Sequence, residues 1–458
     1  MIWRNEMGKK VCMFVWNHFT NDARVLRECS ALAEVGCDVD LICIHDYKTQ
    51  DLPRFETRKE GFRVTRVKNN IAMFRIAAKW LSQMKKQPKQ NLVSIFFILA
   101  IVMLGLFFFP KTTIVLGIFA FLTLILLFKL GMAKHVIRFY IFSQMVYWGR
   151  KKRYDIYHSN DLNTLPQGVL CARWFRWKKI PLVYDSHEVQ TSRTGYDSPV
   201  YGWLEKFLLR FTDVMIQENH TRAAFIEELY GFYPKVLHNY PIPSTPEDSD
   251  RVSLHDLLQI PKDEPILLYQ GGIQMGRGLE KIIDAVPLFH RGRMVFIGDG
   301  RIKPDLMKKV QVMNLEDQVY FVDKVPVEVL PDYTKNAYLG FQVLNNVCFN
   351  HYSASSNKLF EYLMAGVPVV ACSFPEIKKV VKGDGCGVCI DSHDVLDIAR
   401  GVNLLLDDPK LREQMHQNCL QARHKYNWLV EKRNFIEIYD QLLGTEYVKR
   451  FSNVQENA

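Results

Sequence analysis

The sequence predicts an α/β protein that contains two doubly wound parallel sheets. Short apolar runs alternate with amphipathic helical patterns along most of the chain, as in strand–helix–strand units. The segment Tyr240–Arg251 is rich in Pro, Ser and Asp, and it divides this alternation into two series. The 458 residues also exceed the roughly 150 residues of an average domain. We therefore expect two Rossmann-like halves that face each other across a cleft, where ligands bind beyond the carboxyl ends of the strands.

Each series consists of short segments rich in β-branched residues. The first series has a helical pattern at Asp22–Glu34, and its expected strands are Val11–Trp16, Asp38–Ile44, Phe62–Val67, Asp155–His158, Pro181–Tyr184, Asp213–Gln217 and Lys235–Leu237. In the second series the expected strands are Ile266–Tyr269, Met294–Ile297, Val319–Val322, Leu339–Leu344, Val367–Ala371 and Gly387–Ile390. Three helical patterns close the chain and end near Leu443.

The composition excludes several classes of protein. With 24% charged and 48% hydrophobic residues, the chain is neither disordered nor collagen-like. The net charge, 59 − 49 = +10, is a modest excess that favours anionic lipid or phosphorylated substrates over a dedicated nucleic-acid surface. Ten cysteines are too few for a disulfide scaffold, so we interpret them as reduced core residues of a cytosolic protein. Cys386 and Cys389 form a Cys-x-x-Cys without a second pair, which argues against a zinc site.

One segment departs from the average hydropathy and predicts a membrane hairpin. Residues 92–109 form an uncharged run of 18 residues, and a second apolar run of 15 residues spans 114–128. As helices these runs reach about 27 Å and about 22 Å, against a hydrocarbon core of about 30 Å. Basic residues flank both ends, which predicts that both flanks are cytoplasmic. A shallow re-entrant pair or a buried helical pair are the alternatives.

A glycine-rich loop in the second series predicts a phosphate site. Residues 269–280 link a strand to a helix and contain Gly271, Gly272 and Gly278. Such loops let backbone N–H groups approach phosphate, and Arg277 adds a guanidinium that suits phosphate oxygens. Gly298 opens a second, weaker Gly-Asp-Gly turn after the next strand. A turn without a ligand is the alternative for both loops.

A second block, residues 350–370, places Ser and Asn caps before a short helix and then Gly-x-Pro before a buried strand. Glu361 falls among apolar neighbours on that helix, where a carboxylate is unfavourable unless it is paired or bound to ligand hydroxyls. Lys358 lies one turn earlier and can face a diphosphate. An exposed Glu–Lys pair on the surface is the alternative.

Together these motifs resemble those of the family-4-type glycosyltransferases of the GT-B fold. The first half of the chain agrees: Asn21–Glu28 resembles their opening helix, and His238–Pro241 resembles the strand that leads into their interdomain linker. Residues 158–161 and 184–188 resemble the strand ends that line their acceptor cleft. The resemblance covers nearly all of the chain except about 70–150. It implies transfer of a sugar from a nucleotide-activated donor, with retention at the anomeric carbon.

The resemblance also implies a role for each motif residue. Arg277 and Lys358 would hold the donor diphosphate and stabilise the leaving charge. Glu361 would bind the donor ribose, and the other residues implied on the donor side are Gly271, Gly272, Gly278, Gly298 and Asn357. His187 matches a histidine that contacts the donor sugar and the reacting centre, with a structural histidine as the alternative. On the acceptor side the resemblance implies Asp161 and Glu188.

Two positions depart from the family pattern. The family often carries two glutamates eight positions apart, and counting back from Glu361 gives Ser353. The contact to the donor sugar is therefore expected to differ. The usual arginine falls at Gly272, and Arg277 stands where the phosphate-binding lysine would be, so one cation could serve both purposes.

The resemblance predicts the following division of the chain. Residues 1–90 and 132–240 would form the N-terminal, acceptor-side Rossmann-like domain, and 91–131 the membrane hairpin inserted in it. A linker at 241–262 would lead to the C-terminal nucleotide-sugar-binding Rossmann-like domain at 263–425. A C-terminal helix at 426–445 could cross back to the N-terminal domain, and 446–458 would be a tail.

No metal or cofactor is expected, and the nucleotide sugar counts as a substrate. Asp38-Val39-Asp40 matches the letters of an Asp-x-Asp metal site but opens a strand at the wrong end of its sheet. The expected partners are the nucleotide-sugar donor, membrane lipid and a lipid-linked glycan or polysaccharide precursor as acceptor, without nucleic acid. We expect a membrane-associated enzyme on the cytoplasmic face of the inner membrane. A GT-B-fold epimerase or phosphorylase, or a catalytically silent membrane-tethered subunit, remain as alternatives.

Overall fold

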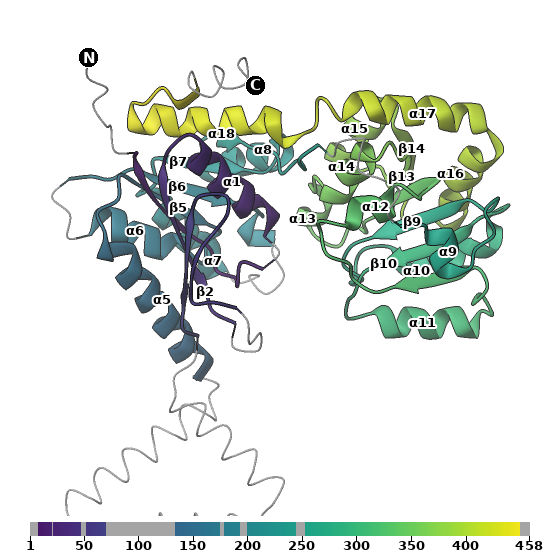
Figure 1. The fold of residues 1–458 in the computed structure, drawn as a ribbon, viewed down its shortest axis with the longest axis horizontal. Coiled ribbons are helices and arrows are strands. Elements are labelled where there is room, and N and C mark those ends of the chain that lie inside the picture. The colour runs from purple at the N-terminus through teal and green to yellow at the C-terminus, as the bar shows by residue number, and fades with distance from the viewer. Residues whose placement is uncertain are drawn as a thin grey trace, which may run out of the picture. The chain divides into compact units, whose positions relative to one another are not determined.

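The structure is a computed structural model that describes residues 8–20, 22–46, 52–69, 133–174, 178–192, 199–243 and 252–448 (Figure 1). These residues form two compact units, which are described one at a time. The first unit takes the described residues within 1–20, 36–159 and 163–180. The second takes those within 21–35, 160–162 and 181–458. The division into domains that the sequence predicts stays a prediction.

The first unit is built on strands in the order β3-β4-β2-β1-β5. These are β1 (Lys10–Phe14), β2 (Asp38–Ile44), β3 (Phe55–Thr57), β4 (Arg63–Val67) and β5 (Ile156–Asn160). The pairs β1–β2, β1–β5 and β2–β4 are parallel, and only β3 runs antiparallel, along β4. The helices of this unit are α5 (Ala133–Lys151) and α6 (Leu165–Arg173). Val11 to Phe14 are fully buried, as expected for a central parallel strand covered on both faces.

The sequence did not predict β3. It has three residues, and its first and third residues are exposed, so it carries no apolar run. Edge strands of this kind are held by ladder hydrogen bonds and long side chains rather than by burial. Here Glu56 accepts hydrogen bonds from Arg58 at 2.9 Å and from Arg66 at 2.7 Å.

The first part of the second unit contains three parallel strands in the order β6-β7-β8. They are β6 (Leu182–Ser186), β7 (Val214–Gln217) and β8 (Lys235–Val236). The accompanying helices are α1 (Ala23–Glu34), η1 (Gln190–Ser192), α7 (Pro199–Leu209) and α8 (His220–Tyr230). Asp22 caps α1 by accepting a hydrogen bond from the Val25 N–H at 3.1 Å, so the helix begins directly after the first residue of the expected helical pattern.

The second part is a six-stranded, fully parallel sheet in the order β11-β10-β9-β12-β13-β14. Its strands are β9 (Ile266–Gln270), β10 (Arg293–Ile297), β11 (Val319–Val322), β12 (Leu339–Gln342), β13 (Val369–Cys372) and β14 (Gly387–Ile390). The helices are α9 (Leu254–Leu258), α10 (Leu279–Ala285), η2 (Val286–Leu288), α11 (Lys303–Val312), α12 (Leu330–Thr334), α13 (Phe349–Tyr352), α14 (Asn357–Met364), α15 (Pro375–Gly383), α16 (Val395–Asp407), α17 (Pro409–Ala422) and α18 (Trp428–Leu443).

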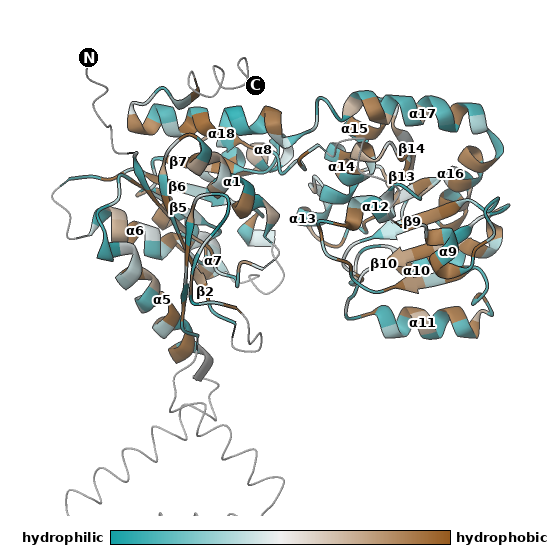
Figure 2. Ribbon diagram, viewed as in Figure 1, coloured by the Kyte–Doolittle hydropathy of each residue, from teal (hydrophilic) through white to brown (hydrophobic). Residues whose placement is uncertain are grey.

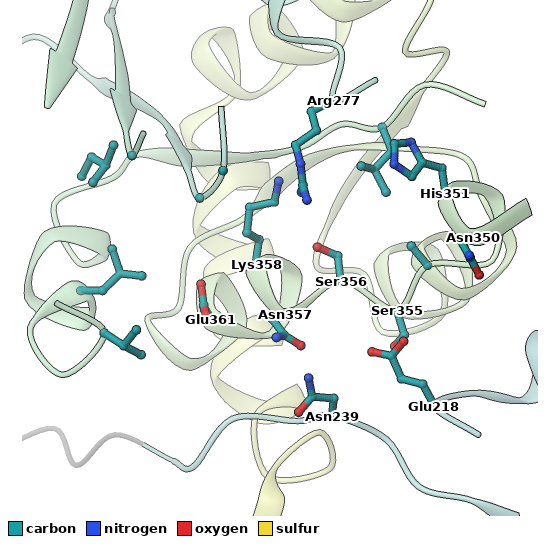
Figure 3. A pocket seen from close by; sticks show the side chains of 18 of the residues that line it. Glu218, Asn239, Arg277, Asn350, His351, Ser355, Ser356, Asn357, Lys358 and Glu361 are labelled. Carbon is teal, nitrogen blue, oxygen red and sulfur yellow. The ribbon is translucent and has the colours of Figure 1, made fainter. Parts of the chain in front are cut away.

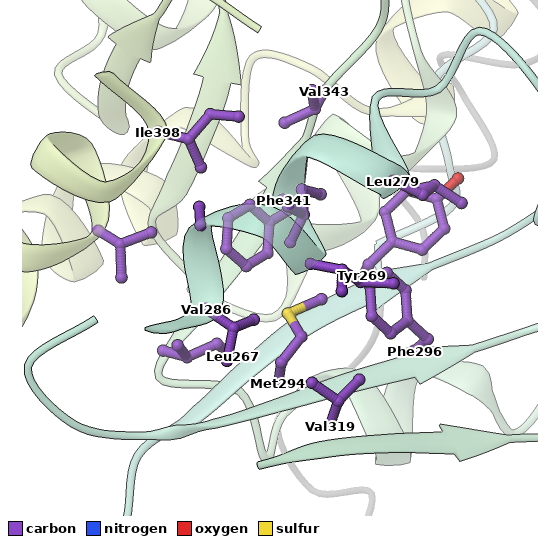
Figure 4. Packing of buried hydrophobic residues seen from close by; sticks show 14 of the residues in the cluster. Leu267, Tyr269, Leu279, Val286, Met294, Phe296, Val319, Phe341, Val343 and Ile398 are labelled. Atoms are coloured by element: carbon purple, nitrogen blue, oxygen red, sulfur yellow. The ribbon is translucent and has the colours of Figure 1, made fainter. Parts of the chain in front are cut away.

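Alternate residues of β9 fill the cores on the two faces of this sheet. Leu267 and Tyr269 pack with Phe296 and Phe341 on one face (Figure 4). Ile266 and Leu268 belong to the cluster on the other face. Figure 2 shows β9 and β10 as largely hydrophobic, whereas α17 and α18 carry hydrophilic bands. Burial on both faces explains why these strands appear in the sequence as apolar runs.

Most expected strands lie within two residues of the observed ones. Val367–Ala371 begins later, at Val369, because the Val367 N–H bonds to the Tyr362 carbonyl at 2.9 Å and so closes the end of α14. Three helices, α16, α17 and α18, close the described chain and end at Leu443, as expected.

The predicted membrane hairpin is not found among the residues that the structure describes. No helix in the described ranges is both long and apolar enough to cross a bilayer. The expected hairpin, residues 91–131, lies outside those ranges, and α5, with 19 residues, carries Arg138 and Arg150. We correct the interpretation accordingly: the predicted fold class keeps its parallel α/β sheets and loses the inserted apolar hairpin.

Candidate active site

A pocket of about 590 Å³ lies in the second unit. Its walls come from the loops after β6, β7, β9 and β10 and from the segment of α13 and α14 (Figure 3). The polar and glycine residues that line it are Glu188, Glu218, Arg222, Asn239, Gly271, Gly272, Arg277, Gly298, Asp299, Lys324, Asn350, His351, Ser355, Ser356, Asn357, Lys358 and Glu361. The loops that form it follow the carboxyl ends of parallel strands, where α/β proteins bind ligands.

The glycine-rich loop reaches the pocket because its residues need no side chain. Gly271 has a φ of 119° and Gly278 a φ of 67°, in the region that favours glycine. A Cβ on Gly278 would lie 2.5 Å from Val343 Cγ1, and a Cβ on Gly298 only 2.0 Å from the Gly271 carbonyl oxygen. The two glycine turns therefore touch each other through their backbones, and this close approach leaves open space at the end of β9.

Two cations point into this space (Figure 3). The Lys358 ammonium donates to the Tyr269 hydroxyl at 3.1 Å and lies 4.3 Å above the Tyr269 ring. Burial lowers the pKa of Lys358 well below its usual value, and the nearby charge of Arg277 lowers it further. Across the described residues, neither Arg277 nor Lys358 forms an ion pair. A bound anion would relieve their mutual repulsion, which is what a diphosphate site requires.

Glu361 lies on α14, the helix that also carries Lys358, and a relay of two hydrogen bonds through Gln270 holds its carboxylate. The Gln270 amide donates to a Glu361 carboxylate oxygen at 2.7 Å, and the Thr334 hydroxyl donates to the Gln270 carbonyl oxygen at 2.8 Å. Gln270 is fully buried. Burial raises the pKa of Glu361, and the Gln270 hydrogen bond partly opposes that rise. The relay therefore fixes the direction in which the carboxylate faces the pocket.

His187 follows β6 and is held by polar contacts. Its Nε2 lies 3.2 Å from Asn160 Oδ1 and 3.4 Å from Asp185 Oδ2, and its backbone N–H donates to the Asp161 carboxylate at 3.2 Å. Burial alone would lower the pKa of His187, but the carboxylates of Asp185 and Asp161 outweigh it and raise the pKa to about 10. The imidazole is therefore charged at neutral pH and acts as a hydrogen-bond donor.

A buried arginine on α1 supports this histidine. Arg24 binds Asp185 in a bidentate pair, with Nε–Oδ2 at 2.8 Å and Nη2–Oδ1 at 2.9 Å. Arg24 also donates to the Leu237 carbonyl at 3.0 Å, and its Nε lies 3.0 Å from an oxygen of the buried Glu28 carboxylate. Arg24 is 5% exposed and Asp185 is fully buried. Arg24 thus holds the carboxylate that charges His187, a role that the sequence analysis did not assign.

The pocket brings most of the expected donor-side residues together. Those that line it are Gly271, Gly272, Arg277, Gly298, Asn357, Lys358 and Glu361, and Glu188 joins them. Three expected residues do not line the pocket: His187, Asp161 and Gly278. His187 directly precedes Glu188 in the sequence, and Gly278 directly follows Arg277, and both of these neighbours line the pocket. The assigned roles stay predictions.

The sequence analysis assigned no role to three residues that line or support the pocket. Gln270 is the last residue of β9 and supports Glu361, whereas the expected strand ended at Tyr269. Glu218 and Arg222 stand four positions apart after β7 and form an ion pair. The i,i+4 spacing directly after a strand is the signal that could have indicated them.

The Asp-x-Asp segment in the first unit is occupied by protein cations. Asp40 binds Arg63 Nε at 2.8 Å, Lys152 Nζ at 2.8 Å and the Tyr154 hydroxyl at 2.9 Å. These contacts lower the pKa of Asp40 against the opposing effect of burial. The segment therefore has a structural role in its sheet.

Comparison with known proteins gives the class of this protein. A family profile described as "Glycosyl transferases group 1" matches residues 250–421. A D-inositol 3-phosphate glycosyltransferase of Xylanimonas cellulosilytica is 24% identical over 311 residues, which cover 63% of this chain and 72% of the relative. An alpha-D-kanosaminyltransferase of Streptomyces kanamyceticus is 32% identical over 161 residues, which cover 34% of this chain and 40% of the relative.

Solved structures show the same fold. The sucrose-phosphate synthase of Thermosynechococcus elongatus superposes with a TM-score of 0.68 at 15% identity, covering 96% of this chain and all of that one. Anabaena Alr3699/HepE, solved with UDP-glucose, gives a TM-score of 0.66 at 14% identity and covers 94% of this chain and 99% of that one. The protein therefore has the GT-B fold with two Rossmann-like parallel sheets.

The chain is a glycosyltransferase, because the profile match at residues 250–421 and the named relatives agree with the fold. The comparisons support the glycosyltransferase activity and the GT-B fold that the motifs indicated. The membrane hairpin that accompanied it is corrected, since no membrane-spanning helix is found within the described ranges. Location at the inner membrane stays a prediction.

Proposed function

We propose that the protein transfers a glycosyl group from a nucleotide-sugar donor to an acceptor, with retention at the anomeric carbon. The observation that carries the proposal is the pair Arg277 and Lys358, which face one space without an ion-pair partner among the described residues. A diphosphate would supply the missing negative charge. The solved relative that holds UDP-glucose supports a donor of this class.

The same cations account for the chemistry. When the bond between the anomeric carbon and the diphosphate breaks, negative charge grows on the leaving phosphate oxygen. Arg277 offers a fork of N–H donors, and Lys358 offers a positive charge whose desolvation makes an anion more favourable beside it. Both groups are in place before the reaction, so they stabilise the leaving group without reorganisation.

Glu361 and His187 complete the proposal. The Glu361 carboxylate, fixed by Gln270, would accept hydrogen bonds from the ribose hydroxyls of the donor. The charged His187 would donate a hydrogen bond toward the sugar rather than act as a base. The acceptor remains as the sequence analysis predicts, a lipid-linked glycan or polysaccharide precursor, and it needs a separate test.

The test is a screen of radiolabelled nucleotide sugars, scored both for nucleoside diphosphate release and for the fate of the sugar. Transfer predicts release together with label in an acceptor fraction. A lipid-linked acceptor predicts that this label partitions into organic solvent. A changed nucleotide sugar without release would indicate the epimerase alternative, and consumption of phosphate would indicate the phosphorylase. Nucleotide binding without turnover would indicate the silent subunit.

A further inference from the structure

We propose that Glu218, oriented by Arg222, is the carboxylate that recognises a hydroxyl group of the transferred sugar. The inference rests on the proposed function and concerns the part of the pocket farther from Glu361. Figure 3 shows Glu361 and Glu218 at separate sides of the pocket, with Ser356 and Asn357 between them. If the cations hold the diphosphate and Glu361 the ribose, the sugar extends toward Glu218.

The backbone of Glu218 is fixed by its place in the fold. It directly follows β7, and the next residue, Asn219, caps α8 by accepting from the Arg222 N–H at 2.9 Å. The Asn219 amide also donates to the Ser353 carbonyl at 2.8 Å. Glu218 is 14% exposed, so its carboxylate is largely withdrawn from solvent and opens mainly into the pocket that it lines.

Arg222 sets the direction of the Glu218 side chain. The guanidinium is 5% exposed and bonds to one Glu218 oxygen, Oε2. Its other acceptors are neutral: the His187 carbonyl at 2.5 Å, the Asn350 carbonyl at 3.1 Å and the Ser353 hydroxyl at 3.2 Å. Four acceptors hold the planar fork in one orientation. Within the described residues, the second Glu218 oxygen, Oε1, makes no hydrogen bond.

The side chains of Asn350 and His351, which line the pocket near Glu218, make hydrogen bonds to backbone groups of the protein. The Asn350 amide donates to the Val189 carbonyl at 3.0 Å and to the Ser192 carbonyl at 3.1 Å, while its oxygen accepts from the Val189 N–H at 2.8 Å. His351 Nδ1 lies 3.2 Å from the Asn345 carbonyl.

Ser353 is also unable to take this role. It is fully buried, and its hydroxyl donates to the Phe349 carbonyl at 2.7 Å while accepting from Arg222. Its side chain is thus part of the support of Arg222 and does not line the pocket. Glu218 Oε1 is therefore a carboxylate acceptor that the geometry offers to a ligand on this side, where Glu188 and Ser355 also line the pocket.

A carboxylate in such a site selects for a hydrogen-bond donor. A sugar hydroxyl can donate a hydrogen bond to Oε1. An analogue that lacks this hydroxyl would leave the partly buried Oε1 without a hydrogen bond. Sites of this kind discriminate more strongly than apolar ones. The proposal thus defines the substrate class: a donor sugar with a free hydroxyl at the position that meets Glu218.

The experiment compares wild type with Glu218→Gln, which keeps the size of the side chain and an oxygen for Arg222. UDP-glucose, UDP-N-acetylglucosamine and GDP-mannose are screened, and the monodeoxy forms of the active donor are then assayed. We expect wild type to lose at least tenfold in kcat/KM on removal of one particular hydroxyl. Glu218→Gln should lose most of that discrimination. The matched control is Glu228→Gln, an exposed glutamate on α8, the helix that follows Glu218.

Inhibition by UDP or GDP separates recognition of the sugar from folding. The inhibition constant should stay within about threefold in Glu218→Gln, because Glu218 lies apart from the cation pair. Unchanged discrimination in the variant, or an equal loss for diphosphate and donor, would overturn the proposal while leaving the proposed function standing. Failure of wild type to release any nucleoside diphosphate would overturn both.

Discussion

The two cation-bearing regions of the pocket unit differ in how their charges are balanced. Near His187, Arg24 is paired with Asp185 and Arg222 with Glu218. Beside the glycine-rich loop, Arg277 and Lys358 have no such partner in the described part of the chain. Lys358 is buried and Arg277 is half-buried, and a charge withdrawn from water without an ion-pair partner is unfavourable. The difference indicates that the paired arginines stabilise the fold around the site, whereas the unpaired cations bind an anionic ligand.

The largest expected effect is on stability and tests the paired side of this comparison. Arg24→Ala leaves Asp185 buried without its bidentate partner, so we expect a loss of about 3–5 kcal/mol in the free energy of unfolding. Chemical denaturation measures it. Arg400→Ala is the control, because Arg400 is 56% exposed and its pair with Asp397 should contribute at most about 1 kcal/mol. Equal losses in the two variants would mean that Arg24 has no special structural role.

Changes to the unpaired cations, Arg277 and Lys358, should affect the transfer rate more than the stability. We expect Arg277→Ala and Lys358→Ala each to lower transfer at least tenfold, which corresponds to about 1.4 kcal/mol or more of transition-state stabilisation. The thermal stability of Arg277→Ala should hold or rise, because the change removes one of two repelling charges, whereas Lys358→Ala also loses the contacts of Lys358 with Tyr269. Arg301→Ala, an exposed arginine outside the pocket lining, is the control. Wild-type transfer rates in both pocket variants would exclude a diphosphate site at this pair.

A third experiment tests how Glu361 is held. Removing the Gln270 hydrogen bond raises the pKa of Glu361 further, because that bond opposes the effect of burial. We therefore expect Gln270→Leu to raise the KM for the donor several-fold, and more at pH 6 than at pH 8, with a smaller change in kcat. The loss of about 1 kcal/mol matches one hydrogen bond.

Gln342→Leu is the matched control for this third experiment. Gln342 is fully buried on β12, and its amide has no hydrogen-bond partner in the described structure. Its replacement should leave the donor KM unchanged at both pH values. If Gln270→Leu gave the same KM increase at pH 6 and at pH 8, the carboxylate would not be the group that the relay controls.

The sequence predicted those parts of the site whose signals are local. The glycine loop around Gly271 and the helix that carries Lys358 and Glu361 are continuous motifs, and each lies where expected. The Gln270–Glu361 contact joins positions 91 residues apart, and Arg222–Ser353 joins positions 131 apart. No periodicity encodes such pairs, so the buried supports of the site emerged only from the fold. The membrane hairpin was predicted from hydropathy and flanking basic residues, and no helix among the described residues could span a bilayer.

The last comparison concerns two histidines whose environments shift their pKa values in opposite directions. Asp185 and Asp161 raise the pKa of His187 to about 10, whereas burial and the neighbouring His238 lower that of His220. Between its unfolded value of about 6.5 and its folded value, His187 binds more protons in the native state. The free energy of unfolding should therefore fall as pH rises through that window. Histidine NMR titration measures both groups, and His187→Gln should remove this part of the pH dependence. A normal pKa for His187 would show that Arg24 neutralises the charge of Asp185 fully. His187 would then be mostly neutral at pH 7.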